Sequence, residues 1–321
     1  MTASPPKPSQ NPRTESPSSL GRKLRYAAEA GIFLAFMALF RVLGLETASR
    51  VGGWIGRNIF SLLPPDRVAR ANLAAAFPEK TVAERNQIRR SMWDNLGRVV
   101  GEDPHLARFS PKGEDPRITY SLPAGMSLEH LKQQPLIFLS AHLGNWEALP
   151  ILASQLGFDG AAVIRPPNNP YVADWVARQR RINGPDTMIA KHNAARPMLT
   201  QLKAGKMLCM LVDQKLREGI PAPFFGRDAM TTPAPAVLAL RTGAHILMAA
   251  NRRVGGPRFH VTVQPELEFS ASGDEPADIA RLTAAITARI EEMVRADPGQ
   301  WLWIHNRWPT PRDIALMQAS P

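Results

Sequence analysis

The 321-residue chain is long enough to form one large domain or two smaller ones around a full hydrophobic core. Lys and Arg total 39 against 28 Asp and Glu, and the net charge of +11 predicts an acidic partner such as nucleic acid, anionic lipid or an acidic carrier protein. Zinc-finger spacing, alternating basic and aromatic residues and a helix-turn-helix pattern are all missing, which argues against nucleic acid. The single cysteine, Cys209, excludes an intramolecular disulfide and is predicted to be a buried, non-catalytic thiol.

The first 62 residues divide into two regions. Residues 1–20 are rich in Pro, Ser and Thr, and they are predicted to be a disordered tail because they offer little apolar surface to bury. Residues 21–62 are predicted to be a membrane-anchoring or interfacial helical region, whose uncharged centre is Ala30 to Phe40. The apolar run starts late and lacks a clear cleavage site, so we interpret it as a retained anchor rather than a signal peptide.

The orientation of this anchor stays open. Basic residues flank both ends of the apolar run, with Arg22, Lys23 and Arg25 before it and Arg41 and Arg50 after it, so the positive-inside rule selects no direction. The run is short for a spanning helix, and a helix lying in the interface and held by anionic membrane lipid is equally compatible with it. A buried core helix is the third interpretation.

Residues 63–321 are predicted to form a single α/β domain. Two helices are expected first, over 66–75 and from the Thr81–Glu84 capping box toward Val100. Strands and helices then alternate, which predicts a mostly parallel central sheet flanked by helices. The expected strands are 136–139, 161–164, 207–212, 245–250 and 259–263, and the expected helices begin at 145 or cover 170–182, 195–203, 235–241 and 276–295.

Polar residues follow three of these strands immediately. They are His142, Arg165 and Asp213. In parallel sheets ligands bind beyond the carboxyl ends of the strands, so this convergence predicts a functional site there.

The turn after the first of these strands carries His142 and Glu147. Asn145 is a good N-cap, so Glu147 is expected in the first turn of a helix, from which it can reach back to His142. A carboxylate bound to one imidazole nitrogen leaves the other nitrogen to accept a proton from a hydroxyl, which is general-base chemistry. Two simpler interpretations remain: Glu147 as an acid favourable to the helix dipole, and His142 as an ordinary loop histidine.

The following loop contains Arg165, Asn168 and Asn169. A guanidinium at this edge suits a phosphate, a carboxylate or an oxygen that becomes negative during a reaction, although an ion pair with Asp213 is an alternative. Turn formation and helix capping explain the two asparagines without any ligand.

Near the C-terminus, three tryptophans lie close to His305 and Arg307. This cluster suits a membrane interface and packing against the sheet equally well, and we assign His305 no catalytic role.

The stretch Ser140-Ala-His-Leu-Gly-Asn-Trp-Glu147 resembles the H-x4-D/E motif of the glycerolipid acyltransferase superfamily, most closely in the form of the lauroyl and myristoyl transferases of lipid A biosynthesis. The resemblance covers roughly residues 22 to 315. Further stretches match that family in the same order: Asn72-Leu-Ala-Ala-Ala-Phe-Pro-Glu79, Arg165-Pro-Pro-Asn-Asn-Pro170, Asp213-Gln214 with Pro223-Phe-Phe-Gly226, and Trp301-Leu-Trp-Ile-His-Asn-Arg307.

The resemblance implies a membrane-associated O-acyltransferase of lipopolysaccharide biosynthesis. It implies transfer of a fatty acyl chain from acyl carrier protein, or less typically coenzyme A, to a hydroxyl of a Kdo-bearing lipid A precursor. The catalytic domain, residues 63–321, is then expected on the cytoplasmic side of the bacterial inner membrane, with His142 as general base oriented by Glu147. No cofactor and no metal are expected. The expected substrate-binding residues are Arg165, Asn168, Asn169, Asp213, Gln214, Phe225 and Gly226.

One departure from the family pattern follows Gln214. Many members carry acidic or aromatic residues there, whereas this chain has Lys215-Leu216-Arg217, which leaves open the head group that the loop meets. The apolar, proline-rich loop 215–232 is expected to line an acyl channel or to touch the bilayer.

Three alternatives remain at this point. One is an acyltransferase for another bacterial lipid, such as a phosphoinositide mannoside or an ornithine-type lipid. The second is a non-catalytic lipid-binding membrane protein. The third is a metal hydrolase that uses His142 and Glu147.

Overall fold

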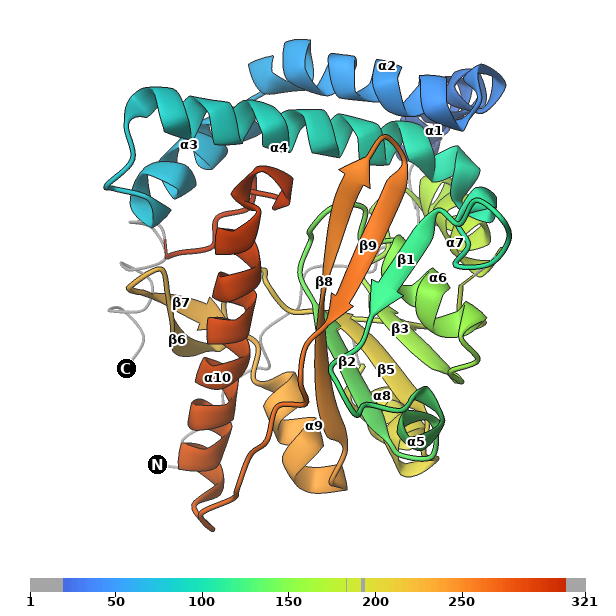
Figure 1. Ribbon diagram of the computed structural model, residues 1–321. Helices are drawn as coiled ribbons and strands as arrows, with labels where there is room; N and C mark the ends of the chain where they lie inside the picture. Colours follow the sequence, from blue (N-terminus) through green and yellow to red (C-terminus); the bar gives the residue numbers. More distant parts are fainter. Residues whose placement is uncertain (1–19, 183, 192–193, 310–321) are drawn as a thin grey trace, which may run out of the picture.

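A seven-stranded sheet forms the centre of the molecule (Figure 1), in the strand order β1-β9-β8-β2-β5-β3-β4. The computed structural model describes residues 20–182, 184–191 and 194–309, so the predicted disordered tail lies almost wholly outside the described residues. The strands are β1 (Ile118–Ser121), β2 (Leu136–Ser140), β3 (Gly160–Ile164), β4 (Thr187–Ala190), β5 (Met207–Leu211), β8 (His245–Gly255) and β9 (Arg258–Val263).

Five neighbouring strands, β8, β2, β5, β3 and β4, run parallel, while β9 pairs antiparallel with β8 and β1 pairs parallel with β9. The predicted α/β fold with a mostly parallel sheet is therefore confirmed. The two edge strands, β1 and β4, were not predicted. Each is four residues long and partly exposed, so neither has the continuous apolar run of the central strands.

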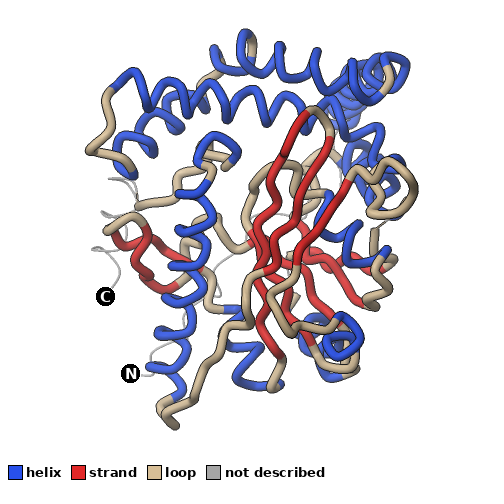
Figure 2. Tube along the Cα trace, in the orientation of Figure 1, coloured by secondary structure: helices blue, strands red, loops and turns tan. Residues whose placement is uncertain are grey.

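Both faces of the sheet are covered, as Figure 2 shows. In β2, Ile137 and Leu139 face the core that contains residues of α8, α9 and α10, whereas Leu136 and Phe138 face the opposite side with α5 and α6. This alternation within an all-apolar run is typical of a strand buried on both faces. The helices are α1 (Leu20–Leu43), α2 (Leu45–Asn58), α3 (Pro65–Ala76), α4 (Val82–Glu102), α5 (Leu128–Lys132), α6 (Ala148–Gln155), α7 (Pro170–Arg181), α8 (Ala195–Lys203), α9 (Ala234–Thr242) and α10 (Glu275–Ala296), with 3-10 turns η1 (Phe60–Leu62), η2 (Asp103–Arg108) and η3 (Pro298–Gln300).

Helices α2 and α4 pack unusually closely across the top of the molecule (Figure 1). Gly52 and Gly56 face Gly97, and a Cβ added at Gly97 would lie 2.1 Å from the carbonyl oxygen of Gly52. Small residues at every fourth position therefore allow the two backbones to touch. The predicted capping box is confirmed: Thr81 and Glu84 exchange hydrogen bonds at the start of α4, whose far end brings Glu102 to the turn after β2.

The C-terminal tryptophans lie in the core. Trp301, Trp303 and Trp308 are buried, and Trp303 and Trp308 donate to backbone carbonyls, so packing is correct and the membrane-interface alternative is wrong for this cluster. The loop expected at 215–232 contains an antiparallel hairpin, β6 (Ile220–Phe224) and β7 (Arg227–Thr231), which contacts α10. Its prolines are at exposed positions of β6, a two-stranded edge that tolerates them.

Candidate active site

His142 and Asp213 meet at the carboxyl edge of the sheet. They follow β2 and β5, which are adjacent parallel strands, so the topology alone brings the two side chains together. Asp213 Oδ1 lies 2.8 Å from His142 Nδ1, and its Oδ2 accepts a hydrogen bond of 2.9 Å from the backbone N–H of His142. The predicted convergence of these two residues is confirmed.

Asp213 is buried yet held in its charged form. Burial alone would raise its pKa, but the charge and hydrogen bonds of His142 and a 2.7 Å bond from Trp301 Nε1 bring the pKa down to about 2. A neutral His142 that donates from Nδ1 to this carboxylate presents Nε2 as an acceptor. That nitrogen lies on the side of Gln214, whose Nε2 is 3.4 Å away.

Glu147 occupies a different environment from the one expected. Among the described residues no hydrogen bond joins it to His142, and the expected direct orientation of His142 by Glu147 is corrected in favour of Asp213. Glu147 forms a two-pronged ion pair with Arg180 of α7, with one contact of 2.8 Å. The physical reason is that α6 begins later than expected, at Ala148, so Glu147 is its N-cap residue and points toward α7.

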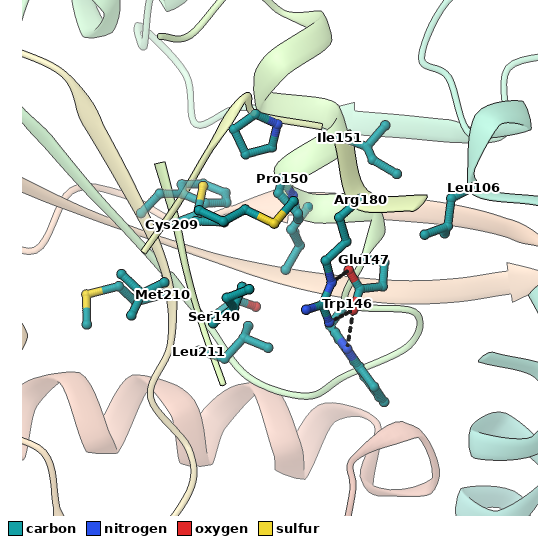
Figure 3. Close-up of a pocket in the computed structure, with 17 residues that line it drawn as sticks. Leu106, Ser140, Trp146, Glu147, Pro150, Ile151, Arg180, Cys209, Met210 and Leu211 are labelled. Atoms are coloured by element: carbon teal, nitrogen blue, oxygen red, sulfur yellow. Dashed lines mark hydrogen bonds and ion pairs between the residues drawn. The ribbon is translucent and has the colours of Figure 1, made fainter. Parts of the chain in front are cut away.

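Trp146 connects the two carboxylate pairs. Its ring lies edge-on to His142 with centroids 5.1 Å apart, and its Nε1 donates a 3.1 Å hydrogen bond to Glu147. Figure 3 shows Trp146, Glu147 and Arg180 gathered on one side of a cavity. The cavity runs between the sheet, α6 and α7, and its lining is largely apolar, including Leu106, Phe138, Ile151, Met188, Cys209 and Leu211.

Glu147 and Arg180 form the polar edge of this cavity and influence the nearby Asp103 electrostatically. Burial and the neighbouring Glu147 carboxylate raise the pKa of Asp103 to about 7, and the Arg180 guanidinium opposes that shift. Burial would lower the pKa of Arg180, but the charge of Glu147 raises it above its usual range. Deep in the cavity, burial raises the pKa of Cys209 to about 12, in keeping with the predicted buried thiol.

The remaining expected site residues lie in two separate connections, the loop between β3 and α7 and the turn of the β6–β7 hairpin. Arg165 and Asn168 are exposed in the loop after β3, at the carboxyl edge of the sheet. Asn169 is buried and structural: it caps α7 through a 3.1 Å bond from the backbone of Tyr171, as its physical interpretation predicted, and donates to α1. Phe225 and Gly226 form the positive-φ turn of the β6–β7 hairpin.

Phe225 belongs to an aromatic cluster rather than to the surroundings of His142. Its ring lies 5.2 Å from that of Phe77 and 6.0 Å from that of Trp303, and the Arg295 guanidinium lies over it at 4.2 Å. Asp213 pairs with His142 rather than with Arg165, so the alternative of an Arg165–Asp213 ion pair is wrong.

Comparison with known proteins bears directly on this site. A family model described as "Bacterial lipid A biosynthesis acyltransferase" matches residues 18–310, a range that includes His142, Glu147 and Asp213. The chain belongs to this family. The resemblance seen in the sequence is thereby confirmed, and the protein is an acyltransferase of lipid A biosynthesis by family.

Individual relatives agree with this assignment. The chain is 25% identical over 293 residues to the lipid A biosynthesis acyltransferase of Haemophilus influenzae, covering 88% of this chain and 87% of the relative. It is 27% identical over 276 residues to the lipid A biosynthesis palmitoleoyltransferase of Escherichia coli, with 80% and 84% covered. It is 25% identical over 297 residues to the myristoyltransferase of the same organism, with 90% and 86% covered. The names of the two Escherichia coli relatives specify different acyl chains. The family assignment therefore supports acyl transfer but not a particular chain length.

The structure of this acyltransferase also reveals a buried network that the sequence did not predict. Glu102 is fully buried and forms an ion pair with Arg253 of β8. Its other contacts come from Ser49 Oγ at 2.6 Å and from Asn145 Nδ2 at 2.9 Å, and Asn145 Oδ1 accepts a 3.1 Å bond from the backbone of Glu147. The network holds the turn between His142 and Glu147 from its inner side.

His305 is a second imidazole near the site. Its ring centroid lies 6.4 Å from that of His142. Partial desolvation of the ring and the charge of His142 lower the pKa of His305 below its usual value. The adjacent run 301–303 returns to the catalytic turn, where Leu302 N–H donates to the His142 carbonyl at 3.2 Å. The Trp301–Arg307 stretch was one of those that carried the resemblance, but long-range pairing to residue 142 has no local sequence signal.

Proposed function

We propose that this protein transfers a fatty acyl chain from an acyl carrier protein thioester to a hydroxyl of a Kdo-bearing lipid A precursor. The observation that carries the proposal is the His142–Asp213 pair at 2.8 Å in a member of the lipid A acyltransferase family. The buried carboxylate fixes the imidazole tautomer, so Nε2 is available to accept the hydroxyl proton.

The proposed reaction takes place at the thioester carbonyl, and one proton moves from the acceptor hydroxyl to the leaving thiolate. His142 Nε2 takes the proton from the acceptor hydroxyl as the oxygen bonds to the carbonyl carbon, and the carbon–sulfur bond breaks. The departing thiolate then takes that proton from the imidazolium. Gln214, close to Nε2, and Arg165, in the adjoining loop, are proposed to stabilise negative charge that develops on the carbonyl oxygen.

Glu147 is proposed to position the site rather than to move the proton. It orients Trp146, which contacts His142, and it holds Arg180 at the polar edge of the cavity. The apolar cavity is proposed to accept the acyl chain, since its lining offers aliphatic and aromatic contacts along its length.

The protein is proposed to work at the inner membrane with the catalytic domain in the cytoplasm. One helix of the described chain, α1, is by length and composition long and apolar enough to cross a bilayer, and the net charge of +11 favours anionic lipid and an acidic carrier protein.

The test is a transfer assay with detergent-purified protein. Acyl carrier protein thioesters of different chain lengths, and the matching coenzyme A thioesters, are each offered with the Kdo-bearing tetraacyl precursor, and products are identified by mass. We expect one added acyl mass from the carrier protein series, and no product with His142→Ala. Transfer only from coenzyme A would refute the proposed donor, and normal product with folded His142→Ala would refute the proposed base.

A further inference from the structure

Helix α1 packs one face against the catalytic domain along most of its length. Ala30, Met37 and Phe40 are buried. At 100° per residue these positions share a side of the helix, and the side chains on the opposite side are exposed. α1 is therefore part of the folded domain's surface rather than a helix that leaves it.

Three contacts fasten this helix. Asn169 Nδ2 donates to the carbonyl of Tyr26 at 2.9 Å. The ring of Phe33 lies edge-on to Trp175 of α7 at 5.3 Å, and His105 Nε2 of η2 lies 3.0 Å from the carbonyl oxygen of Phe40. These contacts extend from residue 26 to residue 40, which is about 21 Å of helix axis.

The neighbours of α1 are incompatible with the centre of a bilayer. If α1 spanned the bilayer, the segment that lies against α7 and η2 would occupy about 21 Å of a hydrocarbon core about 30 Å thick. That arrangement would place α7 in hydrocarbon together with its exposed Asp174 and Arg178. Charged side chains at that depth are strongly unfavourable, so the docked face argues against an upright α1.

The outward face of α1 is apolar. Leu24, Ile32, Leu39 and Val42 are 62%, 75%, 55% and 85% exposed, and they lie within about 80° of one another around the axis. After the bend at Gly44, exposed apolar side chains continue with Trp54, Ile59, Leu62 and Leu63.

Cations border this apolar face. Lys23 and Arg25 lie near the start of α1, Arg41 near its end, and Arg50 on the exposed side of α2. An apolar stripe with Lys and Arg beside it is the pattern of a helix that lies in a membrane interface and binds anionic lipid.

We propose that α1 lies in the plane of the membrane interface, with its outward face in an anionic lipid surface and both of its ends on the catalytic domain's side. This inference rests on the proposed membrane location but not on acyl transfer. It places the docked catalytic domain against the lipid surface.

The first test is the sidedness of two introduced cysteines, Gly21→Cys at the start of α1 and Ala271→Cys in the catalytic domain. Both positions are exposed, and the native Cys209 is buried, so labelling of the unmodified protein is the background. A membrane-impermeant maleimide is applied to intact spheroplasts and to sealed inverted vesicles. We expect both cysteines to react from the same side. Reaction of Gly21→Cys from the opposite side to Ala271→Cys would show that α1 spans and would overturn the inference.

The second test measures the outward face itself. Full-length protein is mixed with vesicles of phosphatidylglycerol and phosphatidylcholine, and Ile32→Gln/Leu39→Gln is compared with the control Val254→Gln, which changes an exposed apolar side chain on β8. We expect partitioning to fall at least tenfold in the double variant and to be unchanged in the control. The inference would be overturned if the double variant partitioned as strongly as the unmodified protein. It would also be overturned if the unmodified protein formed a stable dimer that the double variant does not form.

Transfer in detergent micelles separates this inference from the proposed function. The double variant should retain its activity there, because Ile32 and Leu39 lie outside the site. If the unmodified protein transferred no acyl chain in micelles, the proposed function would be refuted. The result of the sidedness experiment would still hold.

Discussion

His142 and Glu147 stand five positions apart in one turn, and each side chain pairs with a residue from elsewhere in the fold. His142 pairs with Asp213, and the imidazole can gain and lose a proton at its free nitrogen. Glu147 pairs with Arg180, a guanidinium that stays charged. The two ends of one short motif therefore have different partners, and the roles proposed for them differ as well: proton transfer for His142 and positioning for Glu147.

The largest expected effect comes from breaking the first pair. His142→Ala should lower kcat by about 10²- to 10⁴-fold, the usual contribution of a general base, and it should also lower the free energy of unfolding because the buried Asp213 carboxylate loses this partner. Steady-state transfer kinetics and thermal unfolding of the same preparation measure both quantities. His260→Ala, on the outer strand β9, is the matched control and should leave kcat unchanged. A folded His142→Ala protein with normal turnover would contradict the assignment.

Breaking the second pair should act mainly on stability. Glu147→Ala leaves Arg180 mostly buried without its carboxylate, and the free energy of unfolding should fall by about 3 kcal/mol, the lower end for a broken buried pair since Arg180 is 22% exposed. Urea unfolding measures the loss. Glu147→Leu/Arg180→Met removes both charges and should recover much of the stability. If Glu147→Ala unfolds at the same urea concentration as the unmodified protein, the pair has no structural role.

The His142–Asp213 pair should also make stability depend on pH. The pKa of Asp213 is lowered to about 2 from 3.8, so its contribution is fully present above about pH 4 and is lost as pH falls toward 2. That shift corresponds to about 2 kcal/mol. The difference in unfolding free energy between the unmodified protein and Asp213→Asn should therefore shrink between pH 5 and pH 2.5. Glu129→Gln, at an exposed site, is the control, and a difference that stays constant with pH would refute the stabilised carboxylate.

The sequence predicted the parts of the molecule that have local signals. Apolar runs predicted most ends of the five expected strands to within one residue. The Thr81–Glu84 capping box predicted the start of α4. The approach of His142 to Asp213 was predictable because parallel strands bring their carboxyl ends to one edge.

The partner of Glu147 was not predictable in the same way. Its direction depends on α6 starting at Ala148 rather than at Asn145, and helix starts are the least certain boundaries in a sequence. Arg180 comes from α7 and is one of three arginines within four residues, so nothing local distinguishes it from Arg178 and Arg181. The same holds for Glu102 and Arg253, which are 151 positions apart.

The Glu102–Arg253 network offers the smallest and most discriminating change. Glu102→Gln keeps the shape of the side chain but removes the charge that faces Arg253, while an amide oxygen can still accept from Asn145. If the network positions the turn, kcat should fall about tenfold with KM nearly unchanged, because small displacements of the base weaken proton transfer more than binding. Ser49→Ala removes another hydrogen bond to the same carboxylate and should change kcat far less. Equal losses in the two variants, explained wholly by lower stability, would mean that the network supports the fold and leaves the base where it is. A selective loss in Glu102→Gln would instead place the orientation of His142 partly under the control of α4, the helix that α2 packs against, and would connect the N-terminal helices to the chemistry through one buried charge.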